Sequence, residues 1–312
     1  MKQFLLLTFF FTASFLSAQQ LISVELQEVR DRSTLNLFVP VNVEDGIRNY
    51  KVVYTVPFAF GVSTEVSGLL TVPYDSDNGE DFAFPLAVYN HGTSGTRQSV
   101  PSVQGVGERV INLVIGSQGY ITLAPDYLGL GVDDTGVHPY VHAETEAAAG
   151  RNMIAAVKSW MDDQEISYND QLFITGYSQG GHASAALHRD IQLNPGNDDL
   201  TVTAAAHLSG PYSIGEVMAN ILIEGATVTL PGYLAYTYVS YNEIYGIYDD
   251  LGAVFVETYL TPVREFAAGN TELDDVNFSL FTLLDQEGAE LQDIFQDSII
   301  DILANQPEHP IN

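Results

Sequence analysis

Apolar and polar residues alternate most regularly in two neighbouring segments of the N-terminal half. Residues 47–60 and 63–73 place apolar and polar side chains in turn, which is typical of half-buried antiparallel strands. Residues 82–89 and 120–124 are more continuously apolar, as central parallel strands are when helices cover both of their faces. These four segments predict a mixed sheet that begins with an antiparallel hairpin.

Helix-compatible segments separate the later strands. Residues 107–118 are amphipathic, and residues 143–162 carry apolar side chains at helical spacing. Residues 172–177 and 201–208 predict two further strands, with a helix over residues 182–192 between them. Because strands then alternate with helices, the sequence predicts an α/β fold with a doubly wound, mostly parallel sheet.

The chain changes character after Gly210. Residues 214–260 are apolar but irregular and rich in tyrosine. Residues 274–303 are acidic, with leucine and isoleucine at helical spacing. Residues 274–303 are therefore expected to be helical. We expect the sheet to end at the strand over residues 201–208, because no apolar strand is evident beyond it.

The charge balance bears on the partners of the protein. Of the 312 residues, 40 are acidic and 11 are basic, which gives a formal net charge of −29. Such a surface repels phosphate backbones, so we expect no nucleic-acid partner. The chain has no cysteine, so neither disulfides nor thiolate metal sites are expected.

The N-terminus has the pattern of an export signal. Lys2 is followed by an apolar run over residues 4–16 and by Ala18, which predicts a signal peptide over residues 1–18. The apolar run is shorter than the roughly 20 residues that span a bilayer, so no stable membrane anchor is expected. These features predict a secreted or periplasmic protein.

The most informative motif is Gly-x-Ser-x-Gly at residues 176–180. An apolar strand precedes it and a helix-compatible segment follows, so Ser178 lies at the apex of a strand–turn–helix. A serine hydroxyl is a weak nucleophile, and this geometry lets it meet both a base and a substrate carbonyl. Gly176 and Gly180 suit the turn, because side chains there would crowd the strand–helix crossing. The motif predicts Ser178 as the nucleophile of an α/β-hydrolase, against the alternative of a serine in an ordinary glycine turn.

Acyl transfer also needs hydrogen-bond donors aimed at the oxyanion of the tetrahedral intermediate. In this fold one donor is the backbone N–H of the residue after the nucleophile, here Gln179. The glycine-rich segment over residues 90–95 follows an earlier strand and is expected to supply the second donor. That donor is the N–H of Gly92 or of Thr93, between which the sequence does not choose. His91 is expected to brace this loop rather than act as a base.

Four motifs occur in a fixed order along the chain: YNHGT at 89–93, APDYLGLG at 124–131, HPY at 138–140 and GYSQGG at 176–181. Together they resemble the secreted lipase family of α/β-hydrolases, which includes the fungal lipase-A type and bacterial relatives. The resemblance covers about residues 50–208. It implies hydrolysis of carboxylic esters without a cofactor, and a mostly helical lid after the elbow. The resemblance thus implies a lipase or carboxylesterase of lipid degradation, with a small-molecule or lipid ester as its substrate.

Other polar residues in these motifs are open to structural interpretations. Asp126 is expected to hold its loop through backbone bonds rather than to act as the triad acid. Asp133 and Asp134 are expected to be solvated turn residues. His138 and His142 either line the acyl pocket or pack at the start of the helix over residues 143–162.

No base and acid for a catalytic triad are evident after Ser178. In this fold the chain order is Ser, then Asp or Glu, then His. His182 and His188 lie on the elbow helix, which leads away from the site, and His207 precedes any strand that could carry the acid. His309 has no strand or helix to hold it. The triad acid and histidine are therefore left unassigned.

These observations predict a signal peptide at 1–18, a hydrolase core at 19–213 and a lid at 214–305. Residues 306–312 are expected to begin a C-terminal part of the core, with the chain truncated there and lacking the last strands, the triad acid and the histidine. The function predicted is a secreted serine ester hydrolase acting through an acyl-enzyme. The alternatives are a serine peptidase of the same fold and a non-catalytic binding protein on a hydrolase scaffold.

Overall fold

The computed structural model describes residues 21–37, 39–57, 63–74, 82–196, 200–224 and 230–305. The predicted signal peptide at 1–18, the segment 306–312 and His309 lie outside the described residues. No helix among the described residues is both long and apolar enough to cross a membrane.

The core is a seven-stranded mixed sheet in the order β1-β2-β3-β5-β4-β6-β7. The three pairings on the β1 side are antiparallel, and the three that join β5, β4, β6 and β7 are parallel. This is the fold of the α/β-hydrolases, as predicted. The strands are β1 (Leu21–Arg30), β2 (Gly46–Pro57), β3 (Ser63–Tyr74), β4 (Phe84–Asn90), β5 (Ile121–Pro125), β6 (Tyr168–Tyr177) and β7 (Val202–Leu208).

The predicted hairpin is the β2–β3 pair, which is in register from Gly46 opposite Tyr74 to Pro57 opposite Ser63. Strand β1 was not predicted. Its residues are mostly exposed or half-buried, although Ile22, Val24 and Leu26 alternate with polar residues as they do in a half-buried strand.

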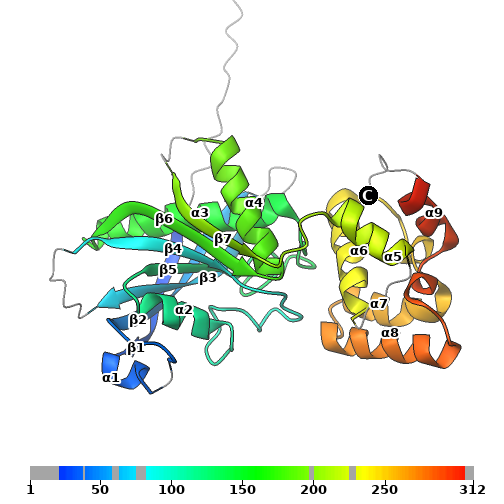
Figure 1. The fold of residues 1–312 in the computed structure, drawn as a ribbon, viewed down its shortest axis with the longest axis horizontal. Coiled ribbons are helices and arrows are strands. Elements are labelled where there is room, and N and C mark those ends of the chain that lie inside the picture. The colour runs from blue at the N-terminus through cyan, green and yellow to red at the C-terminus, as the bar shows by residue number, and fades with distance from the viewer. Residues whose placement is uncertain are drawn as a thin grey trace, which may run out of the picture.

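Helices cover both faces of the sheet, with α2 on one face and α3 and α4 on the other (Figure 1). The central strands β4 and β5 are accordingly buried along most of their length. The helices of this part are α1 (Arg32–Leu35), α2 (Arg109–Gly116), α3 (Ala143–Asp163) and α4 (Gln179–Leu193). The main apolar core packs α3 and α4 against the sheet, with Met153, Val157 and Leu187 fully buried.

Strand β7 forms one edge of the sheet. Within the described part of the chain it pairs with β6 alone, and no strand of the sheet follows it. Residues 203–206 are exposed, and Leu208 is 48% exposed. The sheet therefore ends at the predicted strand, with an uncovered outer edge.

Residues 214–305 form a separate group of short helices beside the end of the sheet (Figure 1). They have an apolar core of their own, in which Phe255, Val263 and Val276 are fully buried, and Tyr140 and Val141 from the hydrolase core join it. The elements are η2 (Ile214–Met218), α5 (Ala219–Ile223), α6 (Gly232–Tyr245), η3 (Leu251–Ala253), α7 (Glu257–Ala267), α8 (Leu273–Glu287), η4 (Leu291–Ile294) and α9 (Asp297–Asn305). We call this group the lid.

The stretch over residues 214–260 is more regular than its sequence suggested. Helix α6 occupies much of it, and its apolar residues do not keep to one side. Ala235 and Tyr236 pack in the lid core, whereas Leu234 and Tyr238 line a cavity as well as touching that core. A helix with apolar residues on several faces shows no clear amphipathic period in its sequence. For this reason the sequence pattern alone did not predict α6.

Candidate active site

Ser178 lies at the turn between β6 and α4. It is the residue before the first turn of α4 and has φ 58° and ψ −124°. A non-glycine residue in this region of backbone space costs on the order of 1–3 kcal/mol, and such strain concentrates at functional sites. The turn is held by three backbone hydrogen bonds: Ser178 N–H to Leu208 O at 2.9 Å, Gly181 N–H to Ser178 O at 2.9 Å and His182 N–H to Ser178 O at 3.3 Å.

Glycines at 176 and 180 allow the strand, the helix and the neighbouring loop to meet closely. A Cβ atom built on Gly176 would lie 2.7 Å from Asn90 O, and one on Gly180 would lie 2.8 Å from His91 O. Real Cβ atoms essentially never come within 3.0 Å of other heavy atoms. The strand and the helix therefore cross as tightly as the two glycines predicted.

The loop expected to supply the second oxyanion donor lies directly against the elbow. Asn90 ends β4, next to Gly176 in the parallel β4–β6 pairing. The Gln179 backbone N–H belongs to the first turn of α4, where amides have no partner within the helix. Gly92 has room around its α-carbon, and the Thr93 hydroxyl lies 3.1 Å from the Tyr140 hydroxyl. The structure does not choose between the N–H groups of Gly92 and Thr93.

His91 braces this loop. Its Nδ1 atom lies 2.8 Å from Gly92 O and its Nε2 atom 3.3 Å from Asp126 O. The ring stacks on Tyr127, with ring centroids 4.3 Å apart, and the Tyr127 hydroxyl donates to His91 O at 3.1 Å. The expectation that His91 holds the loop is confirmed.

Asp126 also holds the loop, as expected. Its carboxylate accepts hydrogen bonds from the Ser102 backbone N–H at 3.0 Å and from the Ser67 hydroxyl at 2.6 Å. The side chain is fully buried, and this burial raises its pKa. One carboxylate oxygen thus holds the backbone at Ser102 and the other holds the Ser67 hydroxyl.

The expectation for Asp133 was wrong. It is 3% exposed, and its carboxylate accepts from the Gly129 N–H at 2.8 Å and from the Thr135 N–H at 3.0 Å. Two amides and the hydroxyls of Thr135 and Thr64 donate to this one carboxylate, and these hydrogen bonds offset the cost of its burial. Asp134 is exposed, as expected.

His138 and His142 pack outside the cavity at Ser178. His142 precedes α3, and its Nε2 atom lies 2.8 Å from the hydroxyl of Tyr245 in the lid. His138 is buried beneath the elbow, where its Nε2 atom lies 2.7 Å from the Gln179 side-chain nitrogen. Of the two possibilities left open, packing at the start of α3 is observed for His142, whereas His138 packs beneath the first turn of α4.

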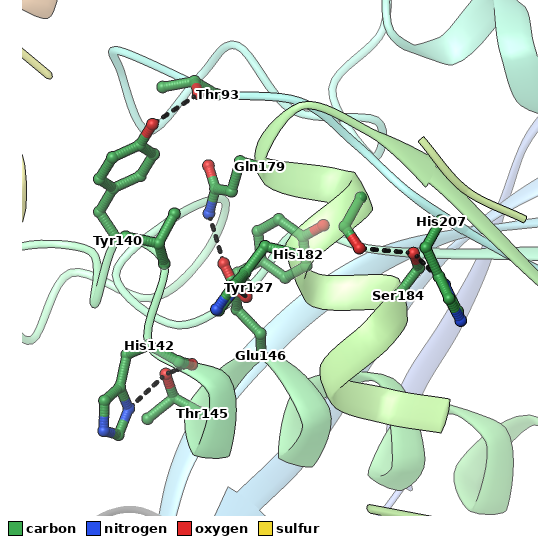
Figure 2. Close-up of polar contacts among 12 residues, drawn as sticks. Thr93, Tyr127, Tyr140, His142, Thr145, Glu146, Gln179, His182, Ser184 and His207 are labelled. Carbon is green, nitrogen blue, oxygen red and sulfur yellow. Dashed lines mark hydrogen bonds and ion pairs between the residues drawn. The ribbon is translucent and has the colours of Figure 1, made fainter. Parts of the chain in front are cut away.

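The described histidines after Ser178 form no contact with its hydroxyl. The Ser178 side chain makes no hydrogen bond within the described residues, and its side chain is half-buried. His207 bonds the Ser184 hydroxyl at 2.8 Å and His188 at 3.1 Å. Figure 2 shows Ser184 and His207 across α4 from Gln179. The triad acid and histidine therefore remain unassigned.

Ser178 opens into a cavity of about 600 Å³ between the hydrolase core and the lid. The lid side is formed by one face of α6 together with residues on either side of it, and the core side by the segments around Tyr140 and Gly210. The wall includes Tyr140, Val141, Ile214, Met218, Tyr233, Leu234, Tyr238, Tyr241, Ile247, Tyr248 and Leu303. The wall also carries a few polar residues, among them Ser209, Thr237 and Asn242. A concave, mostly apolar wall with a few polar groups is typical of small-molecule sites.

The sequence did not predict the cluster beneath the elbow, in which Glu146 accepts from Gln179 at 2.9 Å and from His182 at 2.6 Å. Glu146 is 1% exposed although it lies in the first turn of α3. The only feature of the sequence that could have predicted its burial is its position on the side of α3 that also carries the buried Thr145 and Ala149. Glutamates in the first turn of a helix are common on electrostatic grounds, so that signal is weak.

Comparison with solved structures places this arrangement among the α/β-hydrolases. A protein from Legionella pneumophila, provisionally assigned as a hydrolase, superposes with a TM-score of 0.78 at 25% identity, over 93% of this chain and 77% of that protein. The rice cell wall degrading esterase LipA from Xanthomonas oryzae gives a TM-score of 0.78 at 23% identity, over 93% and 76% of the two chains. Candida antarctica lipase A in its closed state gives 0.62 at 13% identity, over 92% and 62%.

No protein-family model and no curated sequence matches the chain. The structural similarity establishes the α/β-hydrolase fold, and the proteins that carry it here are a hydrolase, an esterase and a lipase by description.

Proposed function

We propose that the protein is an exported serine ester hydrolase of the lipase or carboxylesterase type. The observation that carries the proposal is the strained backbone of Ser178, which holds a half-buried serine between a parallel strand and a helix, at the wall of an apolar cavity. The structural similarity of the chain to an esterase and a lipase of the same fold supports this proposal. Export is proposed from the N-terminal signal-peptide pattern.

In the proposed reaction the Ser178 Oγ atom attacks the carbonyl carbon of an ester that lies in the cavity. The backbone N–H of Gln179 and that of Gly92 or Thr93 donate to the resulting oxyanion. The ester C–O bond then breaks and the alcohol leaves with the proton given up by the Ser178 hydroxyl. A water molecule hydrolyses the acyl-enzyme, which releases the acid and restores the hydroxyl. Each preorganised donor of this kind is worth about 10²–10³ in rate.

The test compares turnover of p-nitrophenyl esters and aminoacyl p-nitroanilides by the purified chain and by Ser178→Ala. We expect slow ester turnover in the parent chain, because no described histidine after Ser178 bonds its hydroxyl, and we expect that turnover to be lost in the variant. Preference for the anilides would favour a peptidase, and turnover that survives in Ser178→Ala would contradict the assignment. An absence of turnover with either substrate would favour a binding protein on this scaffold.

A further inference from the structure

A buried polar cluster lies beneath the elbow, outside the cavity at Ser178. It consists of Glu146 on α3, Gln179 and His182 on α4, and His138 from the loop before α3. These four residues are at most 9% exposed. None of them is among the residues that line the cavity, so the reaction proposed above makes no use of their side chains.

The hydrogen bonds in the cluster have defined directions. The Gln179 side-chain nitrogen donates one hydrogen to Glu146 Oε1 at 2.9 Å and the other to His138 Nε2 at 2.7 Å. His138 can accept because its Nδ1–H donates to Leu128 O at 2.7 Å. The second Glu146 oxygen accepts from His182 Nδ1 at 2.6 Å. Figure 2 shows the carboxylate between these two residues of α4.

The same amide leaves its oxygen without a partner. The Oε1 atom of Gln179 is buried and makes no hydrogen bond within the described residues. Rotating the amide would not help, because the oxygen would then face the Glu146 carboxylate. A buried acceptor without a donor weakens folding. The cluster thus holds Gln179 in place through its nitrogen at some expense of stability, which is typical of a functional constraint.

Gln179 is also the residue whose backbone N–H is proposed to stabilise the oxyanion. Glu146 holds two of the first four residues of α4, Gln179 and His182, through one rigidly buried carboxylate. A donor is effective only when it lies about 2.7–3.1 Å from the developing oxyanion, so small rotations of this turn matter. We propose that Glu146 is a positioning residue, which fixes the first turn of α4 and thereby aims the Gln179 N–H. This inference rests on the proposed function.

The test uses a fluorophosphonate that forms a tetrahedral adduct on Ser178, with the maximal labelling rate and the apparent inhibition constant measured separately. Glu146→Ala removes both acceptors. We expect its labelling rate to fall by about 10–100-fold, less than the loss of a whole donor, while the inhibition constant changes by less than about threefold. Glu146→Gln should retain most of the rate, because a glutamine oxygen can still accept from Gln179, and His182 can present an unprotonated nitrogen to the new amide.

The matched control is Asp190→Ala. Asp190 bonds Arg151 at 2.7 Å and so links the same two helices, α4 and α3, further from Ser178. Its loss should leave the labelling rate unchanged even if it lowers the melting temperature. Gln179→Met removes the Gln179 link, leaves that of His182 and keeps the backbone N–H. It should slow labelling in the same direction as Glu146→Ala, though by less, and serves if that variant does not fold.

Two results separate the possible failures. If the parent chain is not labelled at Ser178, the proposed function is wrong and this inference falls with it. If the parent chain is labelled and the folded Glu146→Ala and Gln179→Met proteins react at the parent rate, the proposed function stands. Glu146 then has a purely structural role.

Discussion

Replacing Gly180 by alanine tests whether the elbow and the oxyanion loop depend on one close contact. The added methyl carbon would lie 2.7 Å from Asn90 C and 2.8 Å from His91 O, and closer still to Asn90 O. Ordinary van der Waals contact begins at 3.4 Å, so the loop or the helix must move by more than half an ångström. The atoms that it meets are backbone atoms at the end of β4, which cannot rotate away as a side chain can.

Overpacking of this kind typically costs about 1–3 kcal/mol, and occasionally more. Because the obstacle is backbone, we expect about 3 kcal/mol for Gly180→Ala. With a urea m-value of about 3 kcal/mol/M, the unfolding midpoint should fall by about 1 M. The displaced residues lead directly into Gly92 and Thr93, so we also expect fluorophosphonate labelling to slow by about 100-fold, as on loss of one oxyanion donor.

The matched control is Gly107→Ala. No atom lies within 4 Å of a Cβ at Gly107, and its backbone has no positive φ. This variant should unfold within about 0.5 kcal/mol of the parent chain and label at the parent rate. A Gly180→Ala protein with the parent midpoint and labelling rate would refute the contact argument.

Three further predictions follow from the site. Ser178→Gly should raise the free energy of unfolding by about 1 kcal/mol relative to Ser178→Ala, because glycine relieves the positive φ of this residue; equal urea midpoints would argue against backbone strain. Burial lowers the pKa of His138 to about 3, below the value near 6.5 of an unfolded histidine, so its protonation favours unfolding. The stabilising effect of neutral His138 is complete above about pH 6.5 and is lost as pH falls toward 3, by up to about 1.4 kcal/mol per pH unit. Between these pH values the free energy of unfolding in urea should fall less steeply for His138→Leu than for the parent chain. Parallel pH profiles of the two proteins would contradict the lowered pKa of His138. The apolar wall of the cavity predicts faster hydrolysis of medium-chain than of acetyl p-nitrophenyl esters, and an equal or inverse preference would leave a general esterase.

The sheet and the elbow could be predicted because each depends on local sequence. The alternation in β2 and β3, the apolar runs of β4 and β5, and the glycines around Ser178 all reflect forces between residues close in the chain. Strand β1 was missed although Ile22, Val24 and Leu26 alternate with polar residues; the alternation is short and breaks at Glu28, where the pairing with β2 shifts register. Helix α6 was not predicted, because apolar residues on more than one of its faces hide the helical period.

The polar cluster under the elbow could not be predicted for a different reason. Glu146 and Gln179 are separated by 33 residues, and only the packing of α3 against α4 brings them together. Asp133 was misjudged for another reason: its two amide partners, Gly129 and Thr135, lie within four residues of it, so its hydrogen bonds are local and only its burial depends on the rest of the fold. Sequence patterns indicate where strands, turns and helices form, whereas the partners of a buried charge such as Glu146 depend on tertiary packing.

The identity of the serine that reacts is the central claim, and one measurement tests it directly. The purified chain is incubated with a fluorophosphonate, digested and analysed by peptide mass spectrometry. We predict a single adduct, on the peptide that contains Ser178, and none in Ser178→Ala. An adduct on any other serine, or a parent chain that remains unmodified, would contradict the assignment of Ser178 as the nucleophile.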